Sequence, residues 1–197
     1  MSEMRLIAIT GGIGSGKSVV SRLVRVMGYE VYDCDSRARS LMTEDSMVRQ
    51  QLIEAFGKET YIDDGSLNRS HLSSTAFTDP GALSKLNAIV HPATATDMIC
   101  WADEQAEAGA TIAFVETALL RTAGLDRVVD EVWHVTAPDQ VRIDRVIARS
   151  GLTAHQVKER MTAQRDEDAL AEGEQVLVND NVTALLPQVI QLLDFRP

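Results

Sequence analysis

The chain has 197 residues, and its 29 acidic and 19 basic residues leave a formal net charge of −10. Such a charge repels nucleic acid unless a local basic run overrides it, and none is present, so we expect no nucleic-acid partner. Cys34 and Cys100 are too few for a disulfide framework or a cysteine-based zinc site, and no apolar run reaches membrane-spanning length. We therefore expect a cytoplasmic protein with one compact core and no membrane partner.

The first predicted strand, 6–10, leads directly into a glycine-rich segment. This segment, Gly11-Gly12-Ile13-Gly14-Ser15-Gly16-Lys17-Ser18, fits the pattern G-x-x-x-x-G-K-[ST] of the phosphate-binding P-loop. Apolar residues at helical spacing follow from Val19 to Met27, so strand, loop and helix come in the order that the motif requires. The motif predicts N–H groups directed at phosphate oxygens, Lys17 on the β- and γ-phosphates, and Ser18 on Mg²⁺.

The second predicted strand, 30–33, ends in two closely spaced aspartates. Side chains two apart share one face of a strand, so Asp33 and Asp35 are expected to point together toward the phosphates while Cys34 points away. Phosphoryl transfer to an alcohol needs a carboxylate that orients the hydroxyl and accepts its proton, and Asp35 is the candidate. The aspartates could instead cap the helix expected to begin near Ser36.

Two carboxylates at strand ends are candidate magnesium ligands through water. Asp33 ends the second predicted strand, and Glu116 follows the apolar run 112–115. P-loop proteins often place an acid at such a position, aimed at the ion or its water shell. Glu116 could equally be a polar residue that ends a buried strand. With Ser18 as the direct ligand, Mg²⁺ bound with ATP is the expected cofactor.

The remaining elements predict the fold class. Three further predicted strands lie at 111–115, 131–136 and 175–178. Because strands alternate with helical patterns, we expect an α/β fold: a P-loop NTPase-type three-layer sandwich with a five-stranded parallel sheet. In the fourth strand, Trp133 is expected to anchor the core, and His134 is expected to be either packed or harmlessly exposed, without a chemical role.

The stretch 36–109 is too long for a single crossover helix. Helical periodicity at 70–77 and 83–106 predicts an all-helical insertion, with Pro92 interrupting the second helix. Ligands bind at the carboxyl edge of open α/β sheets, so the insertion is expected to bind the acceptor.

A polar segment from Pro138 to Ala171 contains two helical runs separated by Gly151. Its basic residues are Arg142, Arg145, Arg149, Lys158, Arg160 and Arg165. Such a cluster is typical of a lid that closes over phosphates, although a solvated helix face with ordinary ion pairs would have the same composition.

Taken together, these features resemble the dephospho-CoA kinase family. The resemblance covers nearly the whole chain and rests on Thr10 to Ser18, Asp33-Cys34-Asp35, Gly65-Ser66-Leu67-Asn68-Arg69, Leu86-Asn87-Ala88-Ile89-Val90-His91-Pro92, and Gln140 with Arg145 and Arg149. The phosphate loop alone names only a superfamily, whereas the segment that ends in His91-Pro92 is far more specific. The resemblance implies ATP-dependent phosphorylation of the ribose 3′-hydroxyl of dephospho-CoA, which gives coenzyme A and ADP and is the last step of coenzyme A synthesis.

The resemblance also implies roles for individual residues. Asp35, Lys17 and Arg145 would be catalytic. ATP would be bound by Gly12, Ile13, Gly14, Ser15, Gly16, Lys17, Ser18, Val19, Arg145, Arg149 and Asn179. The acceptor would contact Asp35, Arg69, His91 and Leu119. The implied domains are a nucleotide core (1–35, 110–138 and 172–197), a helical acceptor subdomain (36–109) and a lid (139–171), in a monomer or small homo-oligomer.

Three places depart from the family pattern. The segment 116–122 has Ala118 and Thr122 where the family usually has a proline and a second acid, beside the expected acceptor site. Val19 replaces a threonine, and the customary Ala-Asp is absent around residues 173–175.

Two alternative functions remain. A nucleoside or nucleoside-monophosphate kinase would share the loop and the arginine lid, but the segment 86–92 argues against it. A nucleotide-binding regulator with degenerate catalysis is supported only by the altered segment 116–122, and the intact Lys17, Ser18 and Asp35 argue against it.

Overall fold

The structure is a computed structural model that describes residues 4–78 and 80–194, without the side chains of residues 76–78 and 80. The outer limits expected for the nucleotide core, residues 1 and 197, lie outside these ranges. The chain divides into two compact units, one formed by Met1–Asp33 with Ala102–Pro197 and the other by Cys34–Trp101. We call them the core unit and the helical unit.

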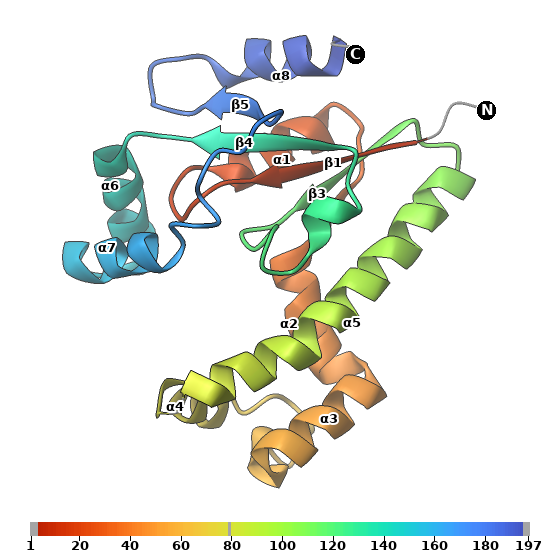
Figure 1. Cartoon of the computed structure of the whole chain (residues 1–197), viewed down its shortest axis with the longest axis vertical. Helices are drawn as coiled ribbons and strands as arrows, with labels where there is room; N and C mark the ends of the chain where they lie inside the picture. The colour runs from red at the N-terminus through yellow and green to blue at the C-terminus, as the bar shows by residue number, and fades with distance from the viewer. Residues whose placement is uncertain (1–3, 79, 195–197) are drawn as a thin grey trace. The chain divides into compact units, whose positions relative to one another are not determined.

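The core unit is built on a five-stranded parallel sheet with the strand order β2-β3-β1-β4-β5 (Figure 1). The strands are β1 (Arg5–Thr10), β2 (Val31–Asp33), β3 (Ile112–Glu116), β4 (Glu131–Thr136) and β5 (Gln175–Val178). They are short runs rich in valine, isoleucine and aromatic residues, which suit a parallel sheet covered on both faces. The ends of all five predicted strands agree with the structure to within about one residue, and the predicted α/β fold is confirmed.

Strand β1 is the middle strand of the sheet, and its residues from Leu6 to Thr10 are buried. Ile9 is 0% exposed and packs in one cluster with α1 (Lys17–Val26) and α8 (Leu185–Asp194). In the same cluster, the rings of Phe114 and Trp133 meet edge to face with centroids 5.1 Å apart. The loop that follows β1 is therefore anchored on the buried core of the unit.

Two helices, α6 (Asp139–Ser150) and α7 (Ala154–Ala163), follow β4. Gly151 ends α6 with a positive φ of 68°, a conformation that favours glycine. Thr153 then begins α7 with a capping box, in which its hydroxyl and the side chain of Gln156 each accept the other residue's backbone N–H. The two predicted helical runs are thus present.

The helical unit fills the stretch between β2 and β3. Its elements are α2 (Cys34–Glu44), α3 (Ser46–Phe56), the short 3-10 helix η1 (Lys58–Thr60), α4 (Arg69–Thr78) and most of α5 (Pro80–Glu107). Asp45 caps α3 by accepting the N–H groups of Met47 and Val48 at 2.8 and 2.9 Å. Across the described residues of both units, no helix combines the length and the apolar character needed to cross a membrane.

The expectation that Pro92 interrupts a helix was wrong. Helix α5 runs without a break through Pro92, over 28 residues. A proline removes one helical N–H, which normally costs stability. Val90 and Met98, on either side of it, are buried at 7% and 0% exposure, so packing holds the helix together across this position.

The expectation that Asp33 and Asp35 lie on one face of a strand was also wrong. Strand β2 ends at Asp33, and α2 begins at Cys34, so Asp35 is exposed in the first helical turn. An acid is favoured there because the positive end of the helix dipole stabilises it. The period-2 alternation of a strand does not apply to this pair.

Candidate active site

The loop between β1 and α1 has the backbone geometry of an anion cradle. Gly11, Gly14 and Gly16 have φ angles of 136°, 79° and 101°, which other residues rarely adopt. A Cβ on Gly11 would lie 2.2 Å from the backbone oxygen of Val135, so no side chain fits there. Helix α1 begins after Gly16 without a side-chain cap, which leaves its N-terminal amides available to an anion.

The carbonyl groups of this loop are held from one side by three side chains. Arg142 Nε donates to the carbonyl of Ile13 at 3.0 Å. Arg145 Nη1 donates to the carbonyls of Gly14 and Ser15 at 3.3 and 3.2 Å, and Asn179 Nδ2 also donates to Ser15, at 2.8 Å. Both arginines come from α6, so this helix holds the loop carbonyls in position through their hydrogen bonds.

The backbone N–H groups of Gly14, Gly16 and Ser18 have no acceptor among residues 4–78 and 80–194. Successive N–H groups of this kind, next to a helix N-terminus, bind phosphate oxygens. Lys17 reaches back over the loop, with Nζ 2.7 Å from the carbonyl oxygen of Gly11. The loop therefore fits the triphosphate of a nucleotide.

Asp33 and Glu116 lie side by side at the carboxyl ends of β2 and β3, where they are paired in register. Burial raises the pKa of Glu116 above its ordinary value, and the charge of the neighbouring Asp33 raises it further. A cation would relieve the repulsion between the two carboxylates.

Oxygen donors of this kind fit Mg²⁺. The described residues contain no group of three or more histidines, cysteines or acids that could hold a metal ion unaided. An ion held by Asp33, Glu116 and Ser18 would therefore need the nucleotide phosphates to complete its ligands.

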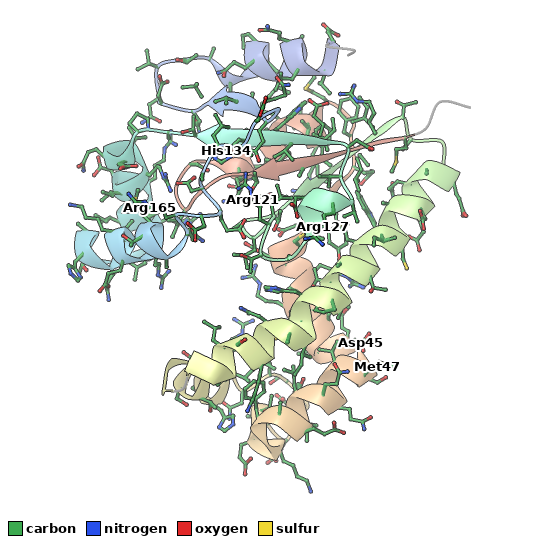
Figure 2. The ribbon with its side chains drawn as sticks, in the orientation of Figure 1. Asp45, Met47, Arg121, Arg127, His134 and Arg165 are labelled. Carbon is green, nitrogen blue, oxygen red and sulfur yellow. The ribbon has the colours of Figure 1, made fainter. Side chains whose placement is uncertain are left out.

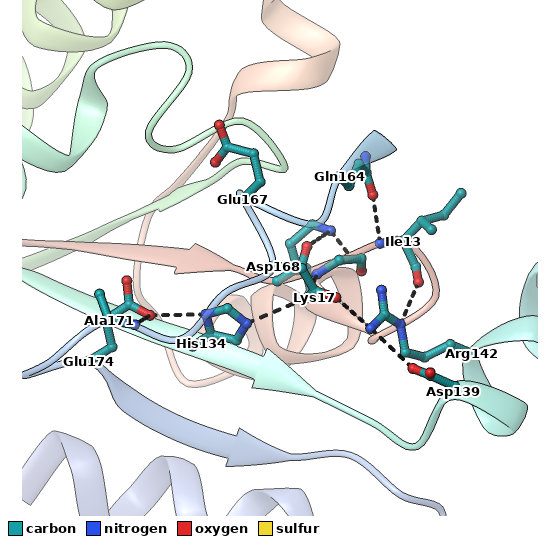
Figure 3. Close-up of polar contacts among 12 residues, drawn as sticks. Ile13, Lys17, His134, Asp139, Arg142, Gln164, Glu167, Asp168, Ala171 and Glu174 are labelled. Carbon is teal, nitrogen blue, oxygen red and sulfur yellow. Dashed lines mark hydrogen bonds and ion pairs between the residues drawn. The ribbon is translucent and has the colours of Figure 1, made fainter. Parts of the chain in front are cut away.

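Residues 164–174, between α7 and β5, form what we call the return segment, which is bound closely to the phosphate loop (Figure 3). Asp168 Oδ1 accepts the backbone N–H of Gly12 at 2.7 Å, and Gln164 Oε1 accepts that of Ile13 at 3.0 Å. Arg142 Nη1 donates to the other oxygen of Asp168 at 2.6 Å. Arg142 therefore contacts both the loop and the return segment.

His134 and two further glutamates extend this network. The imidazole of His134 is buried, with Nδ1 3.0 Å from Glu174 and Nε2 3.6 Å from Asp168 (Figures 2 and 3). Glu167 is also buried, and its carboxylate accepts the backbone N–H groups of Arg121 and Thr122. The segment that lacks the family's proline and second acid is thus held by an acid from the return segment.

No sequence pattern predicted this network. His134 was expected to be either packed or harmlessly exposed, and in the structure it is packed between two carboxylates. The bonded residues of this network are distant in the sequence, and Gly12 and Asp168 are 156 residues apart. No local sequence pattern therefore indicates these contacts.

The predicted site residues fall into two groups. The loop residues, Arg145 and Asn179 lie together in the core unit, where Arg149 is exposed at the end of α6 and Leu119 is half-buried after β3. Asp35, Arg69 and His91 belong to the helical unit, so their part in the site stays a prediction.

Comparison with known proteins identifies the family. The family model for dephospho-CoA kinase matches residues 5–184. This chain belongs to the dephospho-CoA kinase family. Its relatives include the dephospho-CoA kinase of Porphyromonas gingivalis, 36% identical over 193 residues that cover 97% of this chain and 94% of the relative. That of Salinibacter ruber is 38% identical over 178 residues, covering 90% of this chain and 89% of the relative.

Solved structures agree with this membership. A protein from Thermus thermophilus is 31% identical and superposes with a TM-score of 0.76, covering 97% of this chain and 95% of the other. The dephospho-CoA kinase from Campylobacter jejuni is 19% identical, has a TM-score of 0.72 and covers 97% and 96% of the two chains, which supports the fold. The family predicted from the sequence motifs is confirmed.

Proposed function

We propose that this chain transfers the γ-phosphoryl group of ATP to the ribose 3′-hydroxyl of dephospho-CoA, with coenzyme A and ADP as products. The observation that carries the proposal is the family match over residues 5–184, supported by a phosphate loop whose N–H groups have the geometry for a nucleotide. In the reaction the 3′-oxygen forms a bond to the γ-phosphorus, and the bond from that phosphorus to the β–γ bridging oxygen breaks.

The residues of the core unit would bind the donor. The amides of Gly14, Gly16 and Ser18 would hold the phosphates, and Lys17 would leave the Gly11 carbonyl for a phosphate oxygen. Ser18 would ligate Mg²⁺ directly, while Asp33 and Glu116 would hold its water ligands. When bound, this ion supplies positive charge that offsets the charge of the phosphates.

The helical unit would bind the acceptor, with Arg69 and His91 among its contacts, and Leu119 of the core unit would also touch it. Asp35 would orient the 3′-hydroxyl and accept its proton as the phosphoryl group is transferred. Because Asp35 is exposed in the first turn of α2, its carboxylate is open to a substrate. Residues 139–171, with Arg149, would act as a lid that excludes water.

We further propose that the protein works in the cytoplasm as a monomer or small homo-oligomer, without a nucleic-acid or membrane partner. The net charge of −10 supports the absence of a nucleic-acid partner. Cys34 and Cys100 form no disulfide in the described part of the chain, which suits a reducing compartment.

An acceptor panel tests the proposal. ADP release would be followed with ATP and Mg²⁺ and, in turn, dephospho-CoA, adenosine, AMP and CMP. We expect kcat/KM to be highest for dephospho-CoA by a wide margin. Faster turnover of a nucleoside or nucleotide would favour the alternative kinase, and ATP binding without transfer to any acceptor would favour a regulator.

A further inference from the structure

Residues from both ends of the proposed lid contact the phosphate loop. Arg142 lies in α6, which begins the lid, and Asp168 lies near its carboxyl end. Their side chains meet at 2.6 Å, directly beside Gly12. A Cβ built on Gly12 would lie 2.0 Å from Arg142 Nη2 and 2.6 Å from Asp168 Oδ2, so the ion pair packs against this glycine.

The ion pair makes two bonds to adjacent positions of the loop. Asp168 accepts the N–H of Gly12, and Arg142 Nε donates to the carbonyl of Ile13. One N–H and one carbonyl of a single turn are therefore fixed by one bonded pair of side chains. The turn lies immediately before Gly14 and Gly16, whose N–H groups would bind phosphate.

Arg142 depends on Asp168 for its charge balance. The side chain of Arg142 is only 6% exposed, whereas the second acid near it, Asp139, is 3.7 Å away and 80% exposed. A buried cation that loses its partner moves or draws in water, because an unpaired charge is costly in the interior. Loss of Asp168 would thus free both contacts to the loop.

We propose that Asp168 is a positioning residue for ATP binding: with Arg142 it fixes the Gly12–Ile13 turn, so that the N–H groups that follow face the phosphates. The proposal rests on the proposed function only in that the loop binds ATP, and it makes no use of the acceptor. Asp168 acts through Arg142 and the loop backbone and does not itself touch the nucleotide.

The test is calorimetric titration of the full chain with ATP and Mg²⁺ in the absence of acceptor. We expect Asp168→Ala to weaken ATP binding about 10- to 100-fold, the range for a lost hydrogen bond to a charged group. Asp168→Asn keeps an oxygen for the Gly12 N–H but loses the charge, so it should fall between Asp168→Ala and the unchanged chain. Asp166→Ala, an exposed acid on the same segment, is the matched control and should bind ATP normally.

Two further measurements separate positioning from a merely structural role. Thermal unfolding of each variant would be recorded with circular dichroism, and binding would be measured below every unfolding transition. In steady state, KM for ATP should rise in Asp168→Asn, while KM for the acceptor stays within about twofold. Lower thermal stability with unchanged ATP affinity would overturn the proposal, as would tighter ATP binding, which would mean that Asp168 competes with the phosphates.

A double-mutant cycle tests whether the effect passes through Gly12. Gly12→Ala should weaken ATP binding on its own, because its Cβ displaces the ion pair. If both changes disturb the same turn, Gly12→Ala should cost less in the Asp168→Ala background. If the two changes reduced the free energy of ATP binding additively, Asp168 would not act through the Gly12–Ile13 turn. These titrations measure ATP binding in the absence of acceptor. If the chain failed to phosphorylate dephospho-CoA, the acceptor assignment would be refuted, but the proposed role of Asp168 could still be tested.

Discussion

Arg145 stabilises the phosphate loop by donating hydrogen bonds to its backbone carbonyls. The sequence predicted an arginine that touches phosphates, and in the structure Arg145 holds the carbonyls of Gly14 and Ser15 and the backbone oxygen of Asn179. Gly14 also carries one of the N–H groups proposed to bind phosphate, and Ser15 directly precedes another, that of Gly16. Arg145 would therefore act on the loop, whichever nucleotide is bound.

We expect Arg145→Met to weaken ADP and ATP binding by the same factor, about 10-fold or more, since it removes hydrogen bonds from a charged donor. Titration with each nucleotide would measure this. Arg22→Met, an exposed arginine on α1, is the control and should change neither affinity. A loss confined to ATP would contradict this role and would indicate direct contact with the γ-phosphate.

Asp35 is the residue whose predicted role depends most on family resemblance. We expect Asp35→Asn to lower kcat by about 10²- to 10⁴-fold, the contribution typical of a positioned general base. ATP affinity should stay unchanged, because the phosphate loop is intact. Single-turnover kinetics together with ATP titration would measure both quantities. Normal turnover by this variant would rule out Asp35 as the base.

The first glycine of the phosphate loop, Gly11, is required by both its backbone conformation and its close contact with β4. Gly11 and Gly28 both have positive φ angles, of 136° and 95°, so alanine strains the backbone at either position. At Gly11 the added Cβ would also lie 2.2 Å from the Val135 carbonyl oxygen, whereas nothing lies within 4 Å at Gly28. Gly11→Ala should therefore abolish detectable ATP binding, while Gly28→Ala should cost only about 1–2 kcal/mol of stability.

Nucleotide titration and urea unfolding of the two glycine variants would measure these effects. Equal loss of ATP binding in both would show that backbone strain alone, and not the close approach to β4, explains the need for glycine at position 11.

At the scale of elements, the strands and the loop could be predicted because their signals are local. Runs such as 112–115 are apolar and include β-branched residues, and the glycine pattern of the loop is contiguous. The start of α2 could not be predicted, because the aspartate pair fits a strand end and a helix start equally well. The path of α5 through Pro92 depends on packing, which a local rule about proline does not include.

The phosphate loop of the candidate site could be predicted from the sequence. The side chains that hold this loop in place could not. Asp168 and Gln164 bind the loop across more than 150 positions of sequence, with separations of 156 and 151 residues. No periodic pattern links such positions. In the sequence, the acid-rich return segment has the composition of an ordinary solvent-exposed connection. Only the folded structure shows that it contacts Gly12 and Ile13.

At the scale of the whole molecule, acid stability should depend on Asp168. Burial alone would raise the pKa of Asp168, but the nearby imidazole of His134, the hydrogen bond and charge of Arg142, and the hydrogen bond from the Gly12 N–H lower it to about 2. Because this pKa is lower in the folded than in the unfolded chain, the ionised carboxylate stabilises the fold above about pH 4, and this contribution is lost as the pH falls toward 2.

The free energy of unfolding of the native chain should therefore exceed that of Asp168→Asn at neutral pH, and the difference should shrink between about pH 4 and pH 2. Urea unfolding at a series of pH values would measure it. Glu174, on the other side of His134, is present in both proteins, so the comparison isolates the change at position 168. A difference that does not vary with pH would contradict the charged pairing of Asp168.

The central claim concerns the acceptor, and the position of the transferred phosphate tests it most directly. The chain would be incubated with ATP, Mg²⁺ and dephospho-CoA, and the product would be examined by phosphorus NMR and mass spectrometry. We predict one new phosphate monoester, coupled to the ribose 3′-proton and formed in equal amount to ADP. A phosphate at any other position, or ATP consumption that dephospho-CoA does not stimulate, would contradict the assignment.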